Sequence, residues 1–216
     1  MATEHIREQQ RFLHAHRTFL RAGLALVSAF AWVFVFQFSL AYSLSVPRAL
    51  LFALVVYALS QVTLILITPL SAAHLRHGMK RAMFFGALCC ALAFAVLGAT
   101  LAGYFSSPLG WGLVLFGILL GVYHALYWIP YRLQNAGSSR EPDALFEILL
   151  ALMPAFAGVT LASIYLSPLR LLFGAAGLML LSVVPLFFLR DSGERFSWRY
   201  FETFKKLFDV KYRTLT

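Results

Sequence analysis

Residues 49–73, ALLFALVVYALSQVTLILITPLSAA, decide the fold of this chain. The stretch contains no Asp, Glu, Lys or Arg, and it exceeds the roughly 20 apolar residues that a helix needs to cross the hydrocarbon core of a membrane. Its apolar residues are continuous, whereas a strand of a membrane barrel would alternate them with polar residues. Because lipid offers the backbone no hydrogen-bonding partner, the stretch is predicted to be a membrane-spanning helix.

Similar runs recur along the whole chain. The composition agrees with them, because 61% of the residues are hydrophobic and only 12% are charged, against roughly 25% charged in a soluble domain. We therefore predict an all-α integral membrane protein in which residues 22–189 form one domain of six transmembrane helices. The predicted spans are 22–46, 49–73, 82–107, 109–131, 148–169 and 171–189.

Basic residues lie at the ends of these spans and indicate their orientation. Of the 18 Lys and Arg residues, all but Arg48 and Arg170 fall in the N-terminal segment, in the connections after the second and fourth spans, or in the C-terminal segment. Cytoplasmic loops carry an excess of Lys and Arg, so both termini are predicted to be cytoplasmic, in an inner or plasma membrane. The net charge of +9 is then explained by anionic lipid head groups and not by nucleic acid.

Short connections pair the spans into three hairpins. Pro47, Pro108 and Pro168 lie in the outer connections, and each is predicted to occupy the first turn of the following helix, where its missing N–H does no harm. Residues 1–21 are predicted to be a basic cytoplasmic segment. In residues 190–216 apolar residues recur at helical spacing beside basic ones, which predicts an amphipathic helix lying in the inner interface.

Polar groups inside the spans are the candidate functional residues, because such groups are costly in lipid. Gln37 lies in the first span, and Gln61 lies near the middle of the second. The fourth span carries His124 in a polar and aromatic cluster that places Tyr127 and Trp128 on the same broad helical face. We predict that these five residues bind a substrate.

Two interpretations of these residues stay open. In the functional one, the aromatic face lines a central cavity for an apolar or cationic substrate, and His124 hydrogen-bonds the substrate or relays a proton. In the structural one, the aromatic residues form the belt at the inner interface, and His124, Gln37 and Gln61 join helices to one another. Small residues at four-residue spacing in the fourth span, Gly117, Gly121 and Ala125, allow close helix packing.

Other reactive residue types indicate no site. Two histidine pairs, His14 with His16 and His74 with His77, have no nearby Cys or carboxylate that could complete a metal site, so these side chains are predicted to be solvated. The adjacent cysteines of the third span are predicted to be packing residues. The sequence contains no catalytic constellation, so neither an enzyme, a metal nor a cofactor is expected.

The connection between the second and third spans carries a recognisable motif. Residues 71–80 read SAAHLRHGMK, in which Arg76, Gly78 and Lys80 match the pattern Gly-x-x-x-Asp-Arg/Lys-x-Gly-Arg/Lys-Arg/Lys of the major facilitator superfamily. The first glycine, the acidic residue and the ninth position differ from that pattern. Six helices with both ends inside also resemble one half of such a transporter, which is built from two inverted three-helix repeats. The resemblance implies that Arg76, Gly78 and Lys80 belong to a cytoplasmic gate.

The resemblance further implies transport of a small molecule by alternating access. Because a complete member has two six-helix halves, this chain would be a fragment or would pair with a second six-helix chain in the lipid bilayer. One alternative function is a non-transporting membrane scaffold that holds a partner through its C-terminal helix. Another is the permease subunit of an ATP-driven transporter, although the connection at 134–147 is short for that role.

Overall fold

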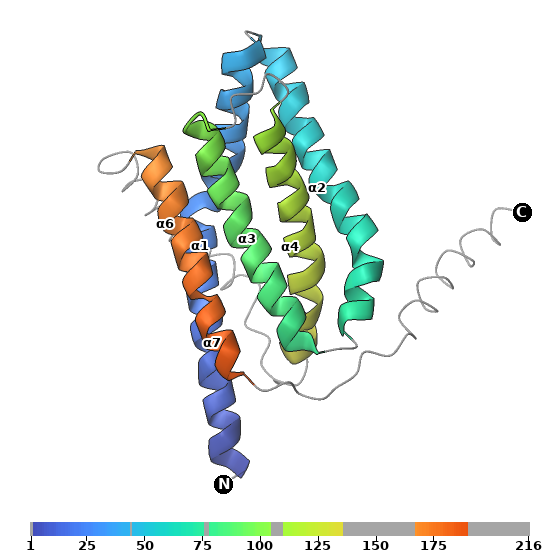
Figure 1. The fold of residues 1–216 in the computed structure, drawn as a ribbon, viewed down its shortest axis with the longest axis vertical. Helices are drawn as coiled ribbons and strands as arrows, with labels where there is room; N and C mark the ends of the chain where they lie inside the picture. Colours follow the sequence, from blue (N-terminus) through green and yellow to red (C-terminus); the bar gives the residue numbers. More distant parts are fainter. Residues whose placement is uncertain (1, 44, 76–77, 105–109, 136–166, 190–216) are drawn as a thin grey trace, which may run out of the picture.

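The computed structural model describes residues 2–43, 45–75, 78–104, 110–135 and 167–189 (Figure 1). Within these ranges every regular element is a helix, and no strand occurs. The helices are α1 (Ala2–Ser43), α2 (Val46–Leu75), α3 (Met79–Leu101), α4 (Trp111–Asn135), α6 (Pro168–Leu181) and α7 (Val183–Phe188). The short helix α7 continues α6 after a break at Ser182.

Five segments in this part of the chain are long and apolar enough to cross a membrane. They are Arg11–Ala41, Val46–Thr68, Lys80–Leu101, Trp111–Trp128 and Pro168–Phe188. The chain is therefore a helical, multi-pass membrane protein, as predicted. Nearly all of the predicted span 148–169, and the whole predicted tail 190–216, lie outside the described residues.

Contacts along α3 set the directions of its neighbours in the bundle (Figure 1). Cys90 of α3 meets Met179 of α6, and Gly98 meets Leu172, so α3 and α6 run in opposite directions. The contacts of α3 with α4, and those of α1 with α6, follow the same antiparallel order. As a consequence, α4 and α6 run in the same direction.

Two glycines let α4 approach α2 closely. A Cβ atom on Gly117 would lie 2.9 Å from the backbone oxygen of Val56, and one on Gly121 would lie against the backbone oxygen of Ser60. Neither helix could approach the other so closely with a larger residue at these positions. The close packing predicted from the four-residue spacing of these glycines is confirmed, and their partner is α2.

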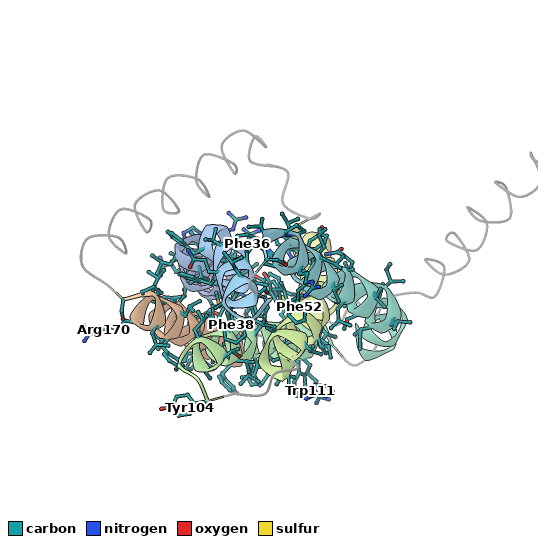
Figure 2. All side chains as sticks on the ribbon, turned by 90° about the horizontal axis from the view of Figure 1, so that it is seen from above. Phe36, Phe38, Phe52, Tyr104, Trp111 and Arg170 are labelled. Atoms are coloured by element: carbon teal, nitrogen blue, oxygen red, sulfur yellow. The ribbon has the colours of Figure 1, made fainter. Side chains whose placement is uncertain are left out.

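Aromatic and basic side chains surround the upper end of the bundle, opposite the N-terminus of α1. Tyr104, Trp111 and Arg170 point outward there, whereas Phe52 of α2 lies toward α4 (Figure 2). Gly110 has a φ of 63°, and a Cβ on it would lie 2.9 Å from the ring of Phe52. A belt of outward-pointing aromatic and basic side chains is typical of a boundary between membrane and water.

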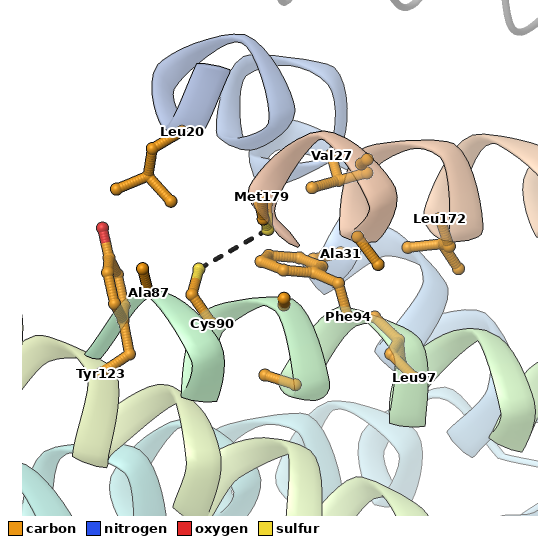
Figure 3. Close-up of a cluster of buried hydrophobic side chains, with 14 of the residues drawn as sticks. Leu20, Val27, Ala31, Ala87, Cys90, Phe94, Leu97, Tyr123, Leu172 and Met179 are labelled. Carbon is orange, nitrogen blue, oxygen red and sulfur yellow. Dashed lines mark hydrogen bonds between the residues drawn. The ribbon is translucent and has the colours of Figure 1, made fainter. Parts of the chain in front are cut away.

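The core of the bundle lies where α1, α3, α4 and α6 meet (Figure 3). Phe94 and Leu97 of α3 are buried at its centre, and the Cys90 Sγ atom lies 3.7 Å from the Met179 Sδ atom. The prediction that the cysteines are packing residues is confirmed for Cys90. By contrast, α2 lies at the edge of the bundle, because many of its large apolar side chains, among them Leu51, Ile65 and Leu66, are exposed.

Most helix ends fall close to the predicted limits, but α3 ends at Leu101, well short of the predicted Ser107. Gly103 causes this early end, since its φ of 85° belongs to the left-handed region that glycine favours. The Tyr104 N–H donates to the Ala99 carbonyl at 3.1 Å, and the Gly103 N–H donates to the Thr100 carbonyl at the same distance. These bonds form a Schellman cap.

Prolines fix two other boundaries. The first predicted span ran to Val46, but α1 ends at Ser43 and α2 begins at Val46, with Pro47 in its first turn. The last span begins at Pro168, three residues before the prediction, because Ser167 is its N-cap and Pro168 stands at its first position. The predicted role of the prolines is thus confirmed for Pro47 and Pro168.

The N-terminal residues from Ala2 onward are helical and continuous with the first span. Helix α1 is continuous from Ala2, so no structural break marks the predicted start of the span at Ala22. The rings of Phe12 and Phe188 stack with centroids 5.4 Å apart, and Leu20 is fully buried. Residues from Phe12 onward therefore pack within the bundle.

Candidate functional site

A buried hydrogen-bonded chain joins three helices near the lower end of the bundle. His16 of α1 is fully buried, and its Nδ1 atom lies 2.6 Å from the Ser182 carbonyl oxygen at the break between α6 and α7. Its Nε2 atom lies 3.1 Å from the hydroxyl of Tyr127 on α4. Because a carbonyl only accepts, Nδ1 carries the proton and donates to Ser182, while Nε2 accepts from Tyr127.

The prediction that His16 is solvated is wrong. The break between α6 and α7 lies at Ser182, one turn before Pro185, whose missing N–H and ring do not fit a regular helix through this turn. The break exposes the Ser182 carbonyl to α1, and His16 occupies it. His14 is exposed, in agreement with the prediction for that residue.

The predicted aromatic face of α4 divides into two sides. Tyr127 is only 3% exposed and packs toward His16 and toward Gly86 of α3. Trp128 is 37% exposed, and its Nε1–H donates to the Nδ1 atom of His124 at 3.0 Å. Since the indole only donates, His124 accepts at Nδ1, and its neutral ring carries the proton on Nε2. Trp128 therefore fixes His124 as a hydrogen-bond donor.

The contacts of Trp32 mark the side on which α1, α2 and α4 face one another. Its ring centroid lies 5.4 Å from that of Tyr57 on α2 and 6.1 Å from that of Phe116 on α4. Arg21 stands about three helical turns below Trp32 on the same face of α1. Gln61 stands one turn below Tyr57 on α2. Both side chains thus belong to this shared side, and both are half-buried.

His124 belongs to the same side of the bundle. It lies about two turns below Gly117, which packs against α2, and its side chain is half-buried. The His16–Tyr127 bond and the contact of Gly121 with α2 fix relative depth. At ~1.5 Å per residue, Arg21, Gln61 and His124 stand within roughly one helical turn of one another along the bundle axis. We call Arg21, Gln61 and His124 the three-helix site.

Gln37 does not belong to this site. It is exposed on α1 together with Val33, one turn away, and lies above Trp32 toward the upper end of the bundle. The ring contact between Trp32 and Phe116 gives a common level on α1 and α4. Gln37 lies above this level and His124 lies below it, so at 1.5 Å per residue the two side chains are separated by roughly 20 Å along the bundle axis. Of the five predicted residues, Gln61 and His124 stand at similar depth on neighbouring helices, and Trp128 is hydrogen-bonded to His124.

Arg21 could not be singled out from the sequence, because it reads as one of several basic residues at the end of a span. Only the continuity of α1 and the burial of Leu20 place it inside the bundle. The signal that the sequence does contain is the spacing of Arg17 and Arg21, which puts both on one helical face together with Trp32.

Two of the three residues that the motif assigns to a gate are described. Gly78 caps α3 with a φ of 127° and a ψ of 133°, and the Lys80 Nζ atom donates to the Phe187 carbonyl at 2.8 Å. That carbonyl lies in the last turn of α7, where it has no partner within the helix and where a positive charge is favourable. Lys80 therefore ties the start of α3 to the end of α7. Arg76 lies outside the described residues.

Replacing Gly78 by Ala is expected to destabilise the protein, because a side chain is strained at this φ wherever it points. The expected loss is about 1–3 kcal/mol. It can be measured as a lower midpoint of thermal unfolding in detergent. The matched control is Gly177→Ala, since a Cβ on Gly177 meets nothing within 4 Å. Equal midpoints for the two variants would contradict the expected strain.

Comparison of the chain with protein-family models, with curated proteins and with solved structures finds no match.

Proposed function

We propose that this protein moves a small molecule across a membrane by alternating access, as one six-helix half of a transporter of the major facilitator type. The three-helix site carries the proposal. Three polar side chains from three different spans stand at similar depth in strongly apolar helices, and polar groups are kept in such surroundings mainly for a function. Trp128 supports a binding role, because it fixes the ring of His124 in one hydrogen-bonding state.

The direction of the described helices supports a sixth span. Because α4 and α6 run in the same direction, α4 ends at the lower end of the bundle and α6 begins at the upper end (Figure 1). The chain between them has to connect the two ends, which fits the predicted span at 148–169. With six spans, the N- and C-termini lie on one side of the membrane.

The pattern of helix contacts supports an inverted repeat. Such a repeat exchanges the first three spans with the last three, so that α1 corresponds to α4 and α3 corresponds to α6. An inverted repeat therefore requires that, if α1 packs on α6, α4 also packs on α3. It also allows α3 to pack on α6, because the exchange leaves this pair unchanged. All three pairs are extensive contacts in the bundle.

The distribution of charge supports a cytoplasmic lower end in an inner or plasma membrane. Arg11, Arg17, Lys80 and Arg81 lie toward this end, whereas Arg48 and Arg170 lie at the upper end. The gate assigned to Gly78 and Lys80 would then act on the cytoplasmic side. Two six-helix chains around one axis would enclose the three-helix site.

Close packing of α2 on α4 favours a second candidate, a membrane scaffold without transport. In that case Gln61 and His124 would only join helices, as the contacts at Gly117 and Gly121 do. Solute transport distinguishes the two functions, since a scaffold moves no solute across a sealed membrane.

Uptake into proteoliposomes tests the proposed function. Three labelled probes represent the main classes of small solute: benzoate as an anion, tetraethylammonium as a cation and glucose as a neutral molecule. We expect at least one of them to enter faster with the protein than without it. His124→Ala should lower that rate about tenfold or more, because a buried hydrogen bond to the substrate is lost. If the protein accelerates none of the probes, the scaffold is favoured.

A further inference from the structure

The start of α3 and the end of α7 meet at the lower end of the bundle (Figure 1). Besides the bond from Lys80 to the Phe187 carbonyl, the ring of Phe187 contacts the ring of Phe84 with centroids 5.3 Å apart. The ring of Phe84 also contacts that of Phe85, at 5.7 Å. Phe85 and Phe187 are both exposed, so an apolar aromatic surface crosses from α3 to α7.

Positive charge gathers beside this aromatic surface. Lys80 and Arg81 are consecutive residues in the first turn of α3, and the Arg81 side chain is exposed. Neither α3 nor α7 contains an acidic residue, so the two helices supply no carboxylate of their own to balance these charges. The N-terminus of a helix is itself positive, so two basic residues in its first turn are unfavourable for the helix alone. This charge pattern favours an anionic partner.

The exposed face of α3 continues above Arg81 as an apolar stripe. Phe85 follows one helical turn later and Leu92 two turns after that, and both side chains are exposed. At about 1.5 Å per residue, the stripe from Arg81 to Leu92 is roughly 16 Å long. The hydrocarbon core of a bilayer is roughly 30 Å thick, so the stripe spans about one leaflet. An amphiphile with an anionic head and an apolar chain matches this surface in charge and in length.

From this placement we propose that Lys80, Arg81, Phe85 and Phe187, which we call the α3–α7 rim, bind an anionic phospholipid. The Arg81 guanidinium holds the lipid phosphate through two parallel N–H donors, and the neighbouring Lys80 adds positive charge while it caps α7. One acyl chain lies along Phe85 and Leu92. Because the lipid contacts both helices, its binding stabilises the junction of α3 with α7.

Thermal unfolding of the purified full chain in a non-ionic detergent tests the inference. Dioleoylphosphatidylglycerol is the anionic phospholipid, dioleoylphosphatidylcholine has the same chains but no net charge, and glycerol phosphate is a soluble phosphate without chains. We expect phosphatidylglycerol to raise the unfolding midpoint in a saturable way and at a lower concentration than phosphatidylcholine. Glycerol phosphate should give no such shift, because the apolar part of the contact is missing.

Variants locate the binding. Arg81→Gln should weaken the apparent affinity for phosphatidylglycerol about tenfold or more, because a charge-assisted bond to the phosphate is lost. Arg81→Lys keeps the charge and should retain part of the affinity. Arg48→Gln is the matched control and should bind like the wild type. Arg48 is also exposed in the first turn of a span and precedes the exposed Leu51 and Val55, but it lies at the upper end and has no basic neighbour.

The outcomes separate this inference from the proposed function. No shift with phosphatidylglycerol, an equal response to the two lipids, or an equal affinity for phosphatidylglycerol in wild type and Arg81→Gln would overturn the lipid site. An equal shift with glycerol phosphate would show a site for free phosphate and would overturn it as well. A failure of transport in proteoliposomes would overturn the proposed function alone, because lipid binding needs no movement of solute.

Discussion

Gly121→Ala is expected to lower the midpoint of thermal unfolding more than any other single-methyl change discussed above. The added Cβ would overlap the backbone oxygen of Ser60 and would also press on the side chain of Thr63. Backbone atoms cannot rotate away, so α2 and α4 must separate along their shared contact. Overpacking of this kind costs about 1–3 kcal/mol. The loss is measured by thermal unfolding of the purified protein in detergent.

The matched control for this variant is Gly174→Ala. Gly174 lies on the exposed side of α6, and a Cβ there meets nothing within 4 Å. Its variant should unfold at the wild-type temperature or slightly above it, because alanine favours the helix more than glycine does. If Gly121→Ala were as stable as Gly174→Ala, the close approach of α2 and α4 would be wrong.

His16→Ala is expected to cause the second large loss of stability. The variant removes both bonds of a fully buried ring, so that the Ser182 carbonyl loses its donor and the Tyr127 hydroxyl loses its acceptor. It also leaves a cavity between α1, α4 and the junction of α6 with α7. Together these effects should cost about 2–5 kcal/mol. Unfolding in detergent should therefore begin well below the wild-type temperature.

Two further variants show whether the network itself is responsible. His14→Ala changes the same residue type two positions away on the same helix, but His14 is exposed, so this variant should be nearly neutral. His16→Gln can both donate and accept, so it should recover part of the stability lost in His16→Ala. Equal losses for His14→Ala and His16→Ala would show that the buried chain of hydrogen bonds contributes little.

Local signals in the sequence account for what was predicted correctly about the fold. Continuous apolar runs revealed the described spans, and prolines located the starts of α2 and α6. The early end of α3 also has a local signal, because Gly103 follows the helix at the position where a left-handed residue caps it. Apolar residues continue beyond Gly103, so the length of the apolar run predicted a helix that is too long.

The site depends instead on contacts between distant parts of the chain. His16 and Arg21 look like ordinary polar residues in front of a span, and only the packing of α1 against α4 and α7 brings them into the bundle. The helical spacing in the fourth span placed Tyr127 and Trp128 together, but the tertiary contacts turn Tyr127 toward α3 and leave Trp128 partly exposed. Periodicity gives the angle of a side chain on its own helix and leaves its neighbour unknown.

The access of water to Gln61 is the most direct test of the central claim. Alternating access requires that the three-helix site be reached by water from each side of the membrane in turn. A cysteine at Gln61 can be probed with a membrane-impermeant maleimide applied to either face of sealed vesicles. The matched control is Val62→Cys. Val62 is the neighbouring residue on α2, and its side chain is 51% exposed on the apolar outer face of that helix. A thiol in lipid does not ionise and stays unreactive.

We expect Gln61→Cys to be labelled from both faces and several times faster than Val62→Cys, after subtraction of the wild-type rate that the native cysteines give. Labelling no faster than at Val62 would contradict alternating access and would leave Gln61 as a packing residue of a closed bundle.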